Sequence, residues 1–145
     1  MLQRGDQKEE TVSDWNAGII QEFRDNEGVV GGYFEGKTLL LLTSTGAKTG
    51  NKHTTPLACY RDGDAWVVIA SANGSDTHPA WYHNLRANPQ AHIEAGTESI
   101  DVEAAEATGE ERDRLYAGMV GIMPQFAEYE TKTARKIPVF RLTQR

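Results

Sequence analysis

The sequence predicts an α+β fold in which short, mostly antiparallel strands build a small closed barrel, with helices inserted and appended. Strand-like runs meet at the turns "TGAKTG", "RDGD" and "AGTE" without a helix between them. A doubly wound sheet would place a helix after each strand, so this order argues against it. Strands this short and this numerous favour a barrel over an open sheet.

The first half of the chain is expected to contain one helix and three strands. Residues 14–28 repeat apolar side chains every four positions, at Trp15, Ile19 and Phe23, which predicts an amphipathic helix that Gly28 ends. Trp15 is expected on the packing face. Strands are predicted at 37–45, 52–62 and 65–72, with a tight turn at 61–64 and a polar loop at 73–78.

The second half alternates helices with strands. Pro79 at the first position and the stop at Asn88-Pro89 predict a helix over 79–88. Thr108 and Glu111 have capping-box spacing for the next helix. The remaining elements are an antiparallel pair at 90–95 and 98–107, helices at 109–123 and 125–134, and a closing strand at 137–143.

The composition is that of a globular protein. The 145 residues fit one domain, divided into an N-terminal helix and connector (1–32) and the barrel (33–145). A net charge of −6 disfavours nucleic acid as a partner. The chain shows no secretory signal and no apolar run near the ~20 residues of a membrane span, and its single cysteine agrees with a reducing compartment. We expect a cytoplasmic protein without a transmembrane segment; peripheral contact with a membrane stays open.

A basic stretch interrupts this acidic chain. No Asp or Glu occurs between residues 36 and 61, and the stretch holds Lys37, Lys48, Lys52, His53 and Arg61. This pattern predicts a site for a small anionic ligand rather than for a long polyanion. A chance cluster on a solvated face is the alternative.

The turn from Gly46 to Gly50 lies within that stretch. It does not follow the phosphate-loop pattern, because only three residues separate the glycines, Lys48 lies between them and a strand follows. We expect the glycines to adopt positive φ, so that consecutive N–H groups face one anion. Charge and hydroxyls would come from Lys48, Lys52, Thr45, Thr49, Thr54 and Thr55. A plain solvated hairpin is the alternative.

Four stretches carry a family resemblance: "TSTGAKTGNKHTTPL", "YRDGD", "VIASANGSDTHPAWYHNLRANP" and "MPQFAEYETKTARKIPVF". In order and spacing, from about residue 36 to 142, they resemble the deazaflavin-dependent nitroreductase family. The resemblance implies a split β-barrel related to flavin-binding reductases. It also implies that the chain binds 8-hydroxy-5-deazaflavin coenzyme (coenzyme F-420), a two-electron hydride carrier with a phosphorylated, glutamylated tail.

The resemblance also assigns site residues by position. Lys48, Thr49 and Gly50 match the turn that grips the coenzyme phosphate. The positions beside the deazaflavin ring are Pro56, Leu57, Ala70 and Ser71, and those at the helix start that closes over the cofactor are Pro79, Ala80, Trp81 and Asn84. Phe126 and Tyr129 match an aromatic pair that lines the substrate pocket. Without the resemblance, Trp81 would be interpreted as a core residue.

The chain departs from the family pattern near the coenzyme tail. Arginine is common where Ala47 and His53 stand, proline where Lys52 stands, and lysine where Ala72 stands. We expect Lys52 and His53 to substitute in tail binding, although lysine offers a point charge rather than a fork.

The implied reaction passes a hydride from the reduced coenzyme to a quinone, a nitro-aromatic compound or a similar conjugated acceptor such as an enone. Negative charge builds on the acceptor oxygen, and Tyr129 and Ser71 are the candidate hydroxyl donors. Phe126 and Tyr129 share one helix face, whereas Ser71 is expected first to position the cofactor. No metal is required, the four histidines are scattered, and Cys59 is expected to be buried and inert within its strand.

Two other interpretations stay open. An FMN-dependent reductase or oxidase of the same fold would use the same lysines for the FMN phosphate. A non-catalytic protein would sequester the coenzyme or another anion. Titration distinguishes the cofactors, and turnover distinguishes an enzyme from a binding protein. The acceptor and the oligomeric state are not determined by the sequence.

Overall fold

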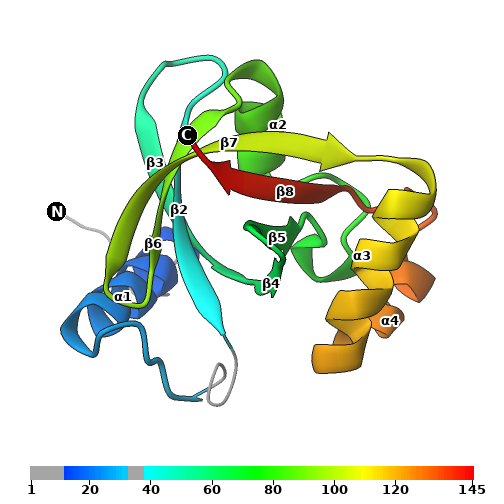
Figure 1. Ribbon diagram of the computed structural model, residues 1–145, viewed down its shortest axis with the longest axis horizontal. Helices are drawn as coiled ribbons and strands as arrows, with labels where there is room; N and C mark the ends of the chain where they lie inside the picture. The colour runs from blue at the N-terminus through cyan, green and yellow to red at the C-terminus, as the bar shows by residue number, and fades with distance from the viewer. Residues whose placement is uncertain (1–11, 33–37) are drawn as a thin grey trace, which may run out of the picture.

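The computed structural model describes residues 12–32 and 38–145; Lys37 of the basic stretch lies outside them. The described residues form these elements in order: α1 (Val12–Asp25), β2 (Leu39–Thr45), β3 (Lys52–Ala58), β4 (Tyr60–Asp62), β5 (Ala65–Ile69), the 3-10 helix η2 (Ala72–Gly74), α2 (Ala80–Ala87), β6 (Gln90–Ala95), β7 (Glu98–Ala107), α3 (Gly109–Ile122), α4 (Gln125–Lys132) and β8 (Val139–Gln144). Figure 1 shows α1 at one end of the molecule and α3 and α4 together at the other.

The strands form one curled antiparallel sheet in the order β3-β2-β6-β7-β8-β5-β4. Figure 1 shows it bending into a half-barrel. The two edge strands, β3 and β4, follow one another in the chain with only Cys59 between them, so the curl brings the edges of the sheet together. The predicted α+β class and split-barrel architecture are confirmed.

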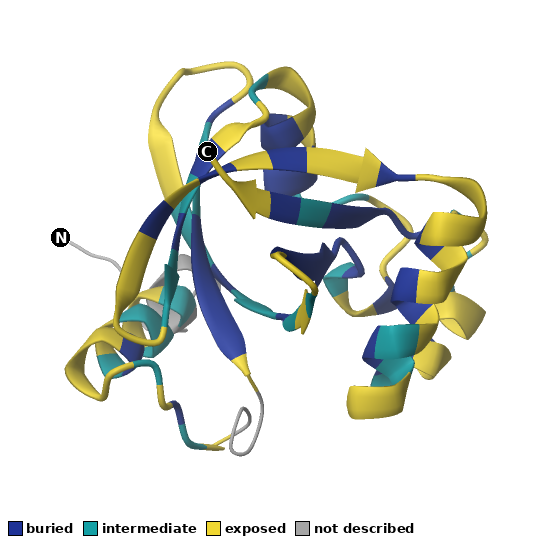
Figure 2. Cartoon of the chain, in the orientation of Figure 1, coloured by how far each residue is buried: buried dark blue, intermediate teal, exposed yellow. Residues whose placement is uncertain are grey.

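The run of four leucines in β2 is buried on both faces of the sheet. Side chains alternate along a strand, so Leu40 and Leu42 point into the barrel core, which also holds Trp81 of α2. Leu39 and Leu41 point to the other face, where they pack with Phe23 of α1. Figure 2 shows this strand buried along most of its length.

Strand β5 divides its side chains in the same way. Trp66 and Val68 enter the barrel core, whereas Val67 and Ile69 lie in a second cluster under α3 and α4. Burial on both faces explains why this strand has five apolar residues in succession. The barrel therefore has a helical layer on its outer face, and α4 is fixed relative to β5.

Three predictions of local structure need correction. The strand predicted over 52–62 is two strands, because the chain changes partner from β2 to β5 at Cys59, whose N–H donates to Thr38 O at 3.0 Å. Pro79 is the N-cap of α2 rather than its first helical residue. Thr108 is the N-cap of α3 but makes no side-chain capping bond; the Glu111 carboxylate lies 3.7 Å from Arg141 of β8 instead.

Candidate active site

Two cavities adjoin beside β3 and α2. The first has a volume of about 620 Å³ and the second about 710 Å³. Asn16, Thr55 and Trp81 line both, so the cavities meet at these residues. Among the described residues, neither lining includes an Asp or a Glu. An anionic ligand therefore meets no carboxylate from the described part of the chain in either cavity.

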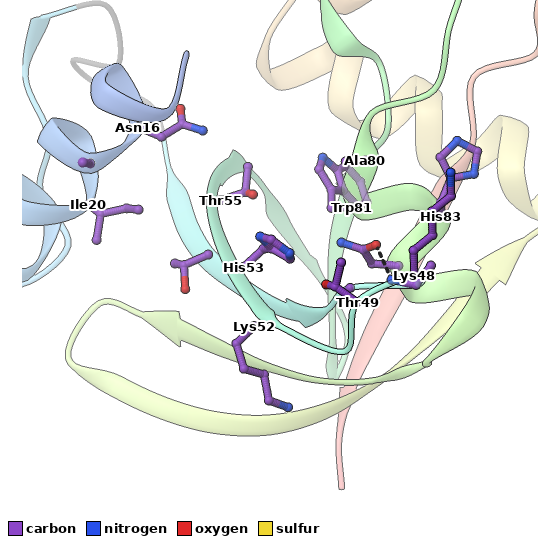
Figure 3. A pocket seen from close by; sticks show the side chains of 15 residues that line it. Asn16, Ile20, Lys48, Thr49, Lys52, His53, Thr55, Ala80, Trp81 and His83 are labelled. Carbon is purple, nitrogen blue, oxygen red and sulfur yellow. Dashed lines mark hydrogen bonds between the residues drawn. The ribbon is translucent and has the colours of Figure 1, made fainter. Parts of the chain in front are cut away.

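The first cavity is formed by the turn between β2 and β3, by α1 and by α2. Its lining includes the predicted residues Lys48, Thr49, Lys52, His53, Ala80, Trp81 and Asn84. Figure 3 shows Lys48 and Thr49 between β3 and α2, with Lys52 extending away from them. The Lys52 ammonium donates to Thr45 Oγ1 at 2.9 Å, whereas Lys48 makes no ion pair with a described residue. The two lysines are therefore not equivalent, and Lys48 has the unengaged charge.

The backbone of the turn leaves two donors for a ligand. The Gly46 N–H donates to Asn51 O at 2.7 Å, and the Gly50 N–H donates to Gly46 O at 3.0 Å. The N–H groups of Lys48 and Thr49 donate to no acceptor in the described part of the chain. Successive free N–H groups at a turn form a concave anion site. This arrangement fits the predicted anion-binding turn better than a plain hairpin.

The two glycines of the turn serve different needs. Gly50 has φ +76°, as predicted, but Gly46 does not have a positive φ. A Cβ at Gly46 would lie 2.8 Å from Thr49 Oγ1 and 3.2 Å from His53 Nε2. Glycine is needed at position 46 because the side chains of Thr49 and His53 leave no room for a Cβ there. The need for a positive φ explains glycine only at position 50.

Asn84 fixes the turn against α2. Its Oδ1 accepts from the Ala47 N–H at 3.0 Å, and its Nδ2 lies 3.3 Å from the hydroxyl of Ser44. Both Asn84 and Ser44 are buried. The Asn84 amide therefore holds the Ala47 N–H in place, and through Ala47 it orients the next two residues of the turn, Lys48 and Thr49.

The second cavity has an apolar and aromatic lining. It contains the predicted residues Pro56, Leu57, Ser71, Pro79, Trp81, Phe126 and Tyr129. The Phe126 and Tyr129 rings lie edge to face, with centroids 5.1 Å apart, as their spacing on α4 predicts. The buried Tyr116 hydroxyl donates to Phe126 O at 2.6 Å and attaches α4 to α3. A flat, largely apolar ligand suits this wall.

Ser71 provides a polar atom within this apolar lining. The residue is only 8% exposed, and its hydroxyl has no hydrogen-bond partner among the described residues. Buried hydroxyls are normally hydrogen-bonded, so an unpaired one in a cavity wall indicates a ligand contact.

Two predicted site residues line neither cavity. Gly50 lies in the exposed part of the turn. The Ala70 side chain is buried in the barrel core, and its N–H donates to Pro138 O at 2.9 Å. From the sequence, Trp81 is interpreted either as a core residue or as a residue of the cofactor site. It belongs to the barrel core and also lines both cavities.

Sequence reasoning missed two contributions to the site. Asn16 and Ile20 of α1 line the first cavity, although α1 was expected only to pack. No local signal predicts this, because it depends on where α1 docks. Lys132 lines the second cavity, with its Nζ 5.8 Å from the centroid of the Tyr129 ring. Its spacing of three from Tyr129 on one helix face is a signal that was available.

Cys59 and His92 lie outside both cavities, whereas His83 of α2 lines the first. Cys59 is buried, and burial raises the pKa of its thiol to about 12, so it is not a thiolate near neutral pH. His92 lies between Asp101 (Nδ1 to Oδ1, 2.9 Å) and Ser99 (Nε2 to Oγ, 2.6 Å), but this exposed network lines neither cavity. No cluster of three or more potential metal ligands occurs among the described residues.

Comparison with known proteins identifies close relatives. A family profile described as F420H(2)-dependent quinone reductase matches residues 18–144. A protein of Mycobacterium tuberculosis (strain ATCC 25618 / H37Rv) named F420H(2)-dependent quinone reductase is 38% identical over an alignment of 129 residues that covers 85% of each chain.

Solved structures agree with this match. One of an F420-H2 dependent reductase has a TM-score of 0.68 at 38% identity and covers 77% of this chain and 99% of its own. Another, described as a domain-swapped dimer, has a TM-score of 0.69 at 34% identity and covers 91% of this chain and 99% of its own. The profile and these relatives span most of the chain, so the resemblance drawn from the four sequence stretches is confirmed. The chain belongs to the F420H(2)-dependent quinone reductase family.

Proposed function

We propose that this protein is an oxidoreductase that uses reduced coenzyme F-420 to reduce a quinone. Family membership supports the enzyme class and the deazaflavin cofactor. The observation that carries the proposal is that the first cavity, which has Lys48 in its lining, meets the second, aromatic cavity at Asn16, Thr55 and Trp81. One extended ligand with an anionic end and a flat end can therefore reach from Lys48 to Tyr129.

The donor set fits such a coenzyme. The Lys48 ammonium and the N–H groups of Lys48 and Thr49 would hold the phosphate by charge-assisted hydrogen bonds. Pro56 and Leu57 would form a flat wall along the ring, and the unpaired Ser71 hydroxyl would bond a heteroatom of the ring. When bound and reduced, the coenzyme supplies a hydride, which carries two electrons.

The remaining chemistry belongs to side chains of α4. In the proposed reaction the acceptor lies beside Phe126, and the Tyr129 hydroxyl donates to the acceptor oxygen on which negative charge develops. A quinone that takes up a hydride needs one proton to become a quinol, and we assign its delivery to Tyr129, with solvent returning the proton. The cavity walls would have to hold donor and acceptor about 3–3.5 Å apart, which is the separation that hydride transfer requires.

An anaerobic assay tests the proposal. Purified protein with reduced coenzyme and a simple benzoquinone or naphthoquinone should oxidise the coenzyme with saturation in both substrates. Nitro-aromatic compounds and enones are the second class of acceptor, and the same assay ranks them. A protein that binds the coenzyme but turns over none of these acceptors would be a sequestering protein instead.

FMN is the alternative cofactor, because its phosphate would suit the same turn. The family match favours the deazaflavin. Calorimetric titration should show micromolar or tighter binding of the deazaflavin coenzyme and much weaker binding of FMN. Equal affinities would contradict the assignment.

We also propose a cytoplasmic location with peripheral membrane contact when the acceptor is a lipid-soluble quinone. No described helix is both long enough and apolar enough to cross a bilayer. Ile122 is 55% exposed and precedes Met123, which lines the second cavity. Sedimentation with lipid vesicles should carry down a fraction of the wild-type protein and less of the variant Ile122→Gln.

A further inference from the structure

The loop between β5 and α2 forms one wall of the second cavity and has a strained backbone. Ser71, Ala72 and Asn73 line that cavity. Ala72 has φ +46° and Asn73 φ +56°, followed by Gly74 at φ +83°. Residues other than glycine rarely adopt this left-handed conformation, and it persists only where surrounding contacts hold it.

Arg135 makes contacts that hold this loop. Its guanidinium donates to Ser71 O at 2.8 Å and to Ser75 O at 2.7 Å, so it bridges the two ends of the left-handed turn. It also lies 3.0 Å from Nδ1 of His78, just before α2. A guanidinium has only donors, so Nδ1 must be the acceptor, and the imidazole is then neutral with its proton on Nε2. One side chain thus fastens the loop at three points.

The segment that carries Arg135 is itself fixed to the rest of the fold. Pro138 O accepts from the Ala70 N–H at 2.9 Å. Ile137 O accepts two bonds from the buried guanidinium of Arg112, at 2.9 and 3.1 Å. Arg112 also reaches Glu130 of α4 at 3.2 Å. Arg135 therefore holds the loop against a segment that is itself hydrogen-bonded to Arg112 of α3 and to the end of β5, and Arg112 connects this segment to α4.

The opposite wall of the cavity is α4, and the loop contacts α4 at Gly74, at the end of η2. A Cβ at Gly74 would lie 3.0 Å from Lys132 Cβ and 3.2 Å from Tyr129 O, so the loop packs directly on α4. A shift of the loop would move Ser71 relative to Phe126 and Tyr129. The width of the cavity depends on how firmly the loop is held.

We infer that Arg135 is a positioning residue for hydride transfer: by fastening residues 71–78 to the segment before β8, it sets the spacing between the Ser71 wall and the Tyr129 wall. The inference rests on the proposed function. It assigns Arg135 no contact with cofactor or acceptor, because Arg135 lines neither cavity. It predicts a defect at the ring and acceptor end of the site and little change at the phosphate end.

The test compares Arg135→Gln with Lys136→Gln. Lys136 is the next residue, its side chain is 67% exposed, and it lies 3.8 Å from Asp113 rather than on the loop, so this control removes the same charge from the same segment. In the ligand-free protein, hydrogen exchange of the 71–78 amides should be about tenfold faster in Arg135→Gln only. With reduced coenzyme and a quinone, kcat/KM should fall about tenfold or more in Arg135→Gln. Coenzyme affinity should change less than threefold, or roughly 0.6 kcal/mol.

Two further variants keep the test decisive. Arg135→Lys keeps the charge but not the three-point contact, so its exchange and kcat/KM should lie between those of wild type and Arg135→Gln. Arg135→Ala should regain part of its kcat/KM when millimolar methylguanidinium is added, which a general folding defect would not do. Unchanged exchange of the loop together with unchanged kcat/KM in Arg135→Gln would refute the positioning role. If wild type itself failed to reduce quinones, the proposed function would be wrong. Hydrogen exchange of the 71–78 amides would still test whether Arg135 holds the loop.

Discussion

Asn84 gives the sharpest test of how the anion-binding turn is built. Asn84→Ala removes the acceptor for the Ala47 N–H and the donor to Ser44. Each lost hydrogen bond costs about 0.5–1.5 kcal/mol. Ala47 is exposed, so water replaces its partner, but Ser44 is only 1% exposed and its unpaired hydroxyl adds about 1–3 kcal/mol. We expect a total loss of roughly 2–4 kcal/mol, which lowers Tm by roughly 5–12 °C in a domain of this size.

Asn84→Asp separates stability from binding. The Ala47 N–H can still donate to a carboxylate oxygen, and the Ser44 hydroxyl can turn to donate to the other. Stability should therefore fall less than in Asn84→Ala. The new negative charge would lie beside the turn that is proposed to hold the phosphate, and two unit charges about 8 Å apart repel by about 2 kcal/mol at an effective dielectric constant of about 20. The coenzyme dissociation constant should rise about thirtyfold.

Thermal unfolding and calorimetric titration of the two variants form the assay. Asn84→Ala should be the less stable protein and Asn84→Asp the weaker binder at low salt. Added salt should narrow the gap in affinity, because it screens the introduced charge. If Asn84→Asp bound the coenzyme as tightly as wild type, the anion would not lie at this turn.

Three more predictions follow from the site. Lys48→Ala should raise the coenzyme dissociation constant about tenfold to a hundredfold at low salt, because a charge-assisted contact is worth about 1.5–3 kcal/mol. Unchanged affinity would show that the turn is a plain hairpin that does not bind the phosphate. Tyr129→Phe should lower quinone turnover at least about tenfold with coenzyme affinity nearly constant, whereas Phe126→Leu should mainly raise the KM for the acceptor; near-normal turnover by Tyr129→Phe would show that no phenolic donor is needed. Burial, and then the Arg135 cation, lower the pKa of His78. The unfolded chain therefore takes up a proton near pH 6.5 before the folded protein does, so stability should fall as pH drops from 7 to 5, and His78→Gln should reduce that slope in Tm against pH.

Where most of the strands and turns lie along the chain, and the class of ligand, could be predicted from the sequence because these signals are local. Alternation in "QAHIEA" and "ESIDVEAAEA" predicted β6 and β7 with the bounds that the structure has. The basic turn and the aromatic pair on α4 are also patterns within a few residues, and the structure places them in two adjoining cavities. Such features depend on backbone geometry and on neighbours close in the chain.

Only the tertiary structure decided how the parts of the site meet. The Ala47 N–H finds its acceptor 37 residues away in Asn84, and Ser71 O finds Arg135 64 residues away. Asn16 lines the site because α1 docks beside β3, and Gly46 is required because Thr49 and His53 fold over it. The packing around Gly46 is set within the hairpin, whereas the contacts of Asn84, Arg135 and Asn16 depend on the curl of the sheet, which brings distant segments together without leaving a pattern at either one. The sequence by itself therefore determined which chemistry the chain carries, and the packing of the half-barrel determined which residues hold that chemistry in place.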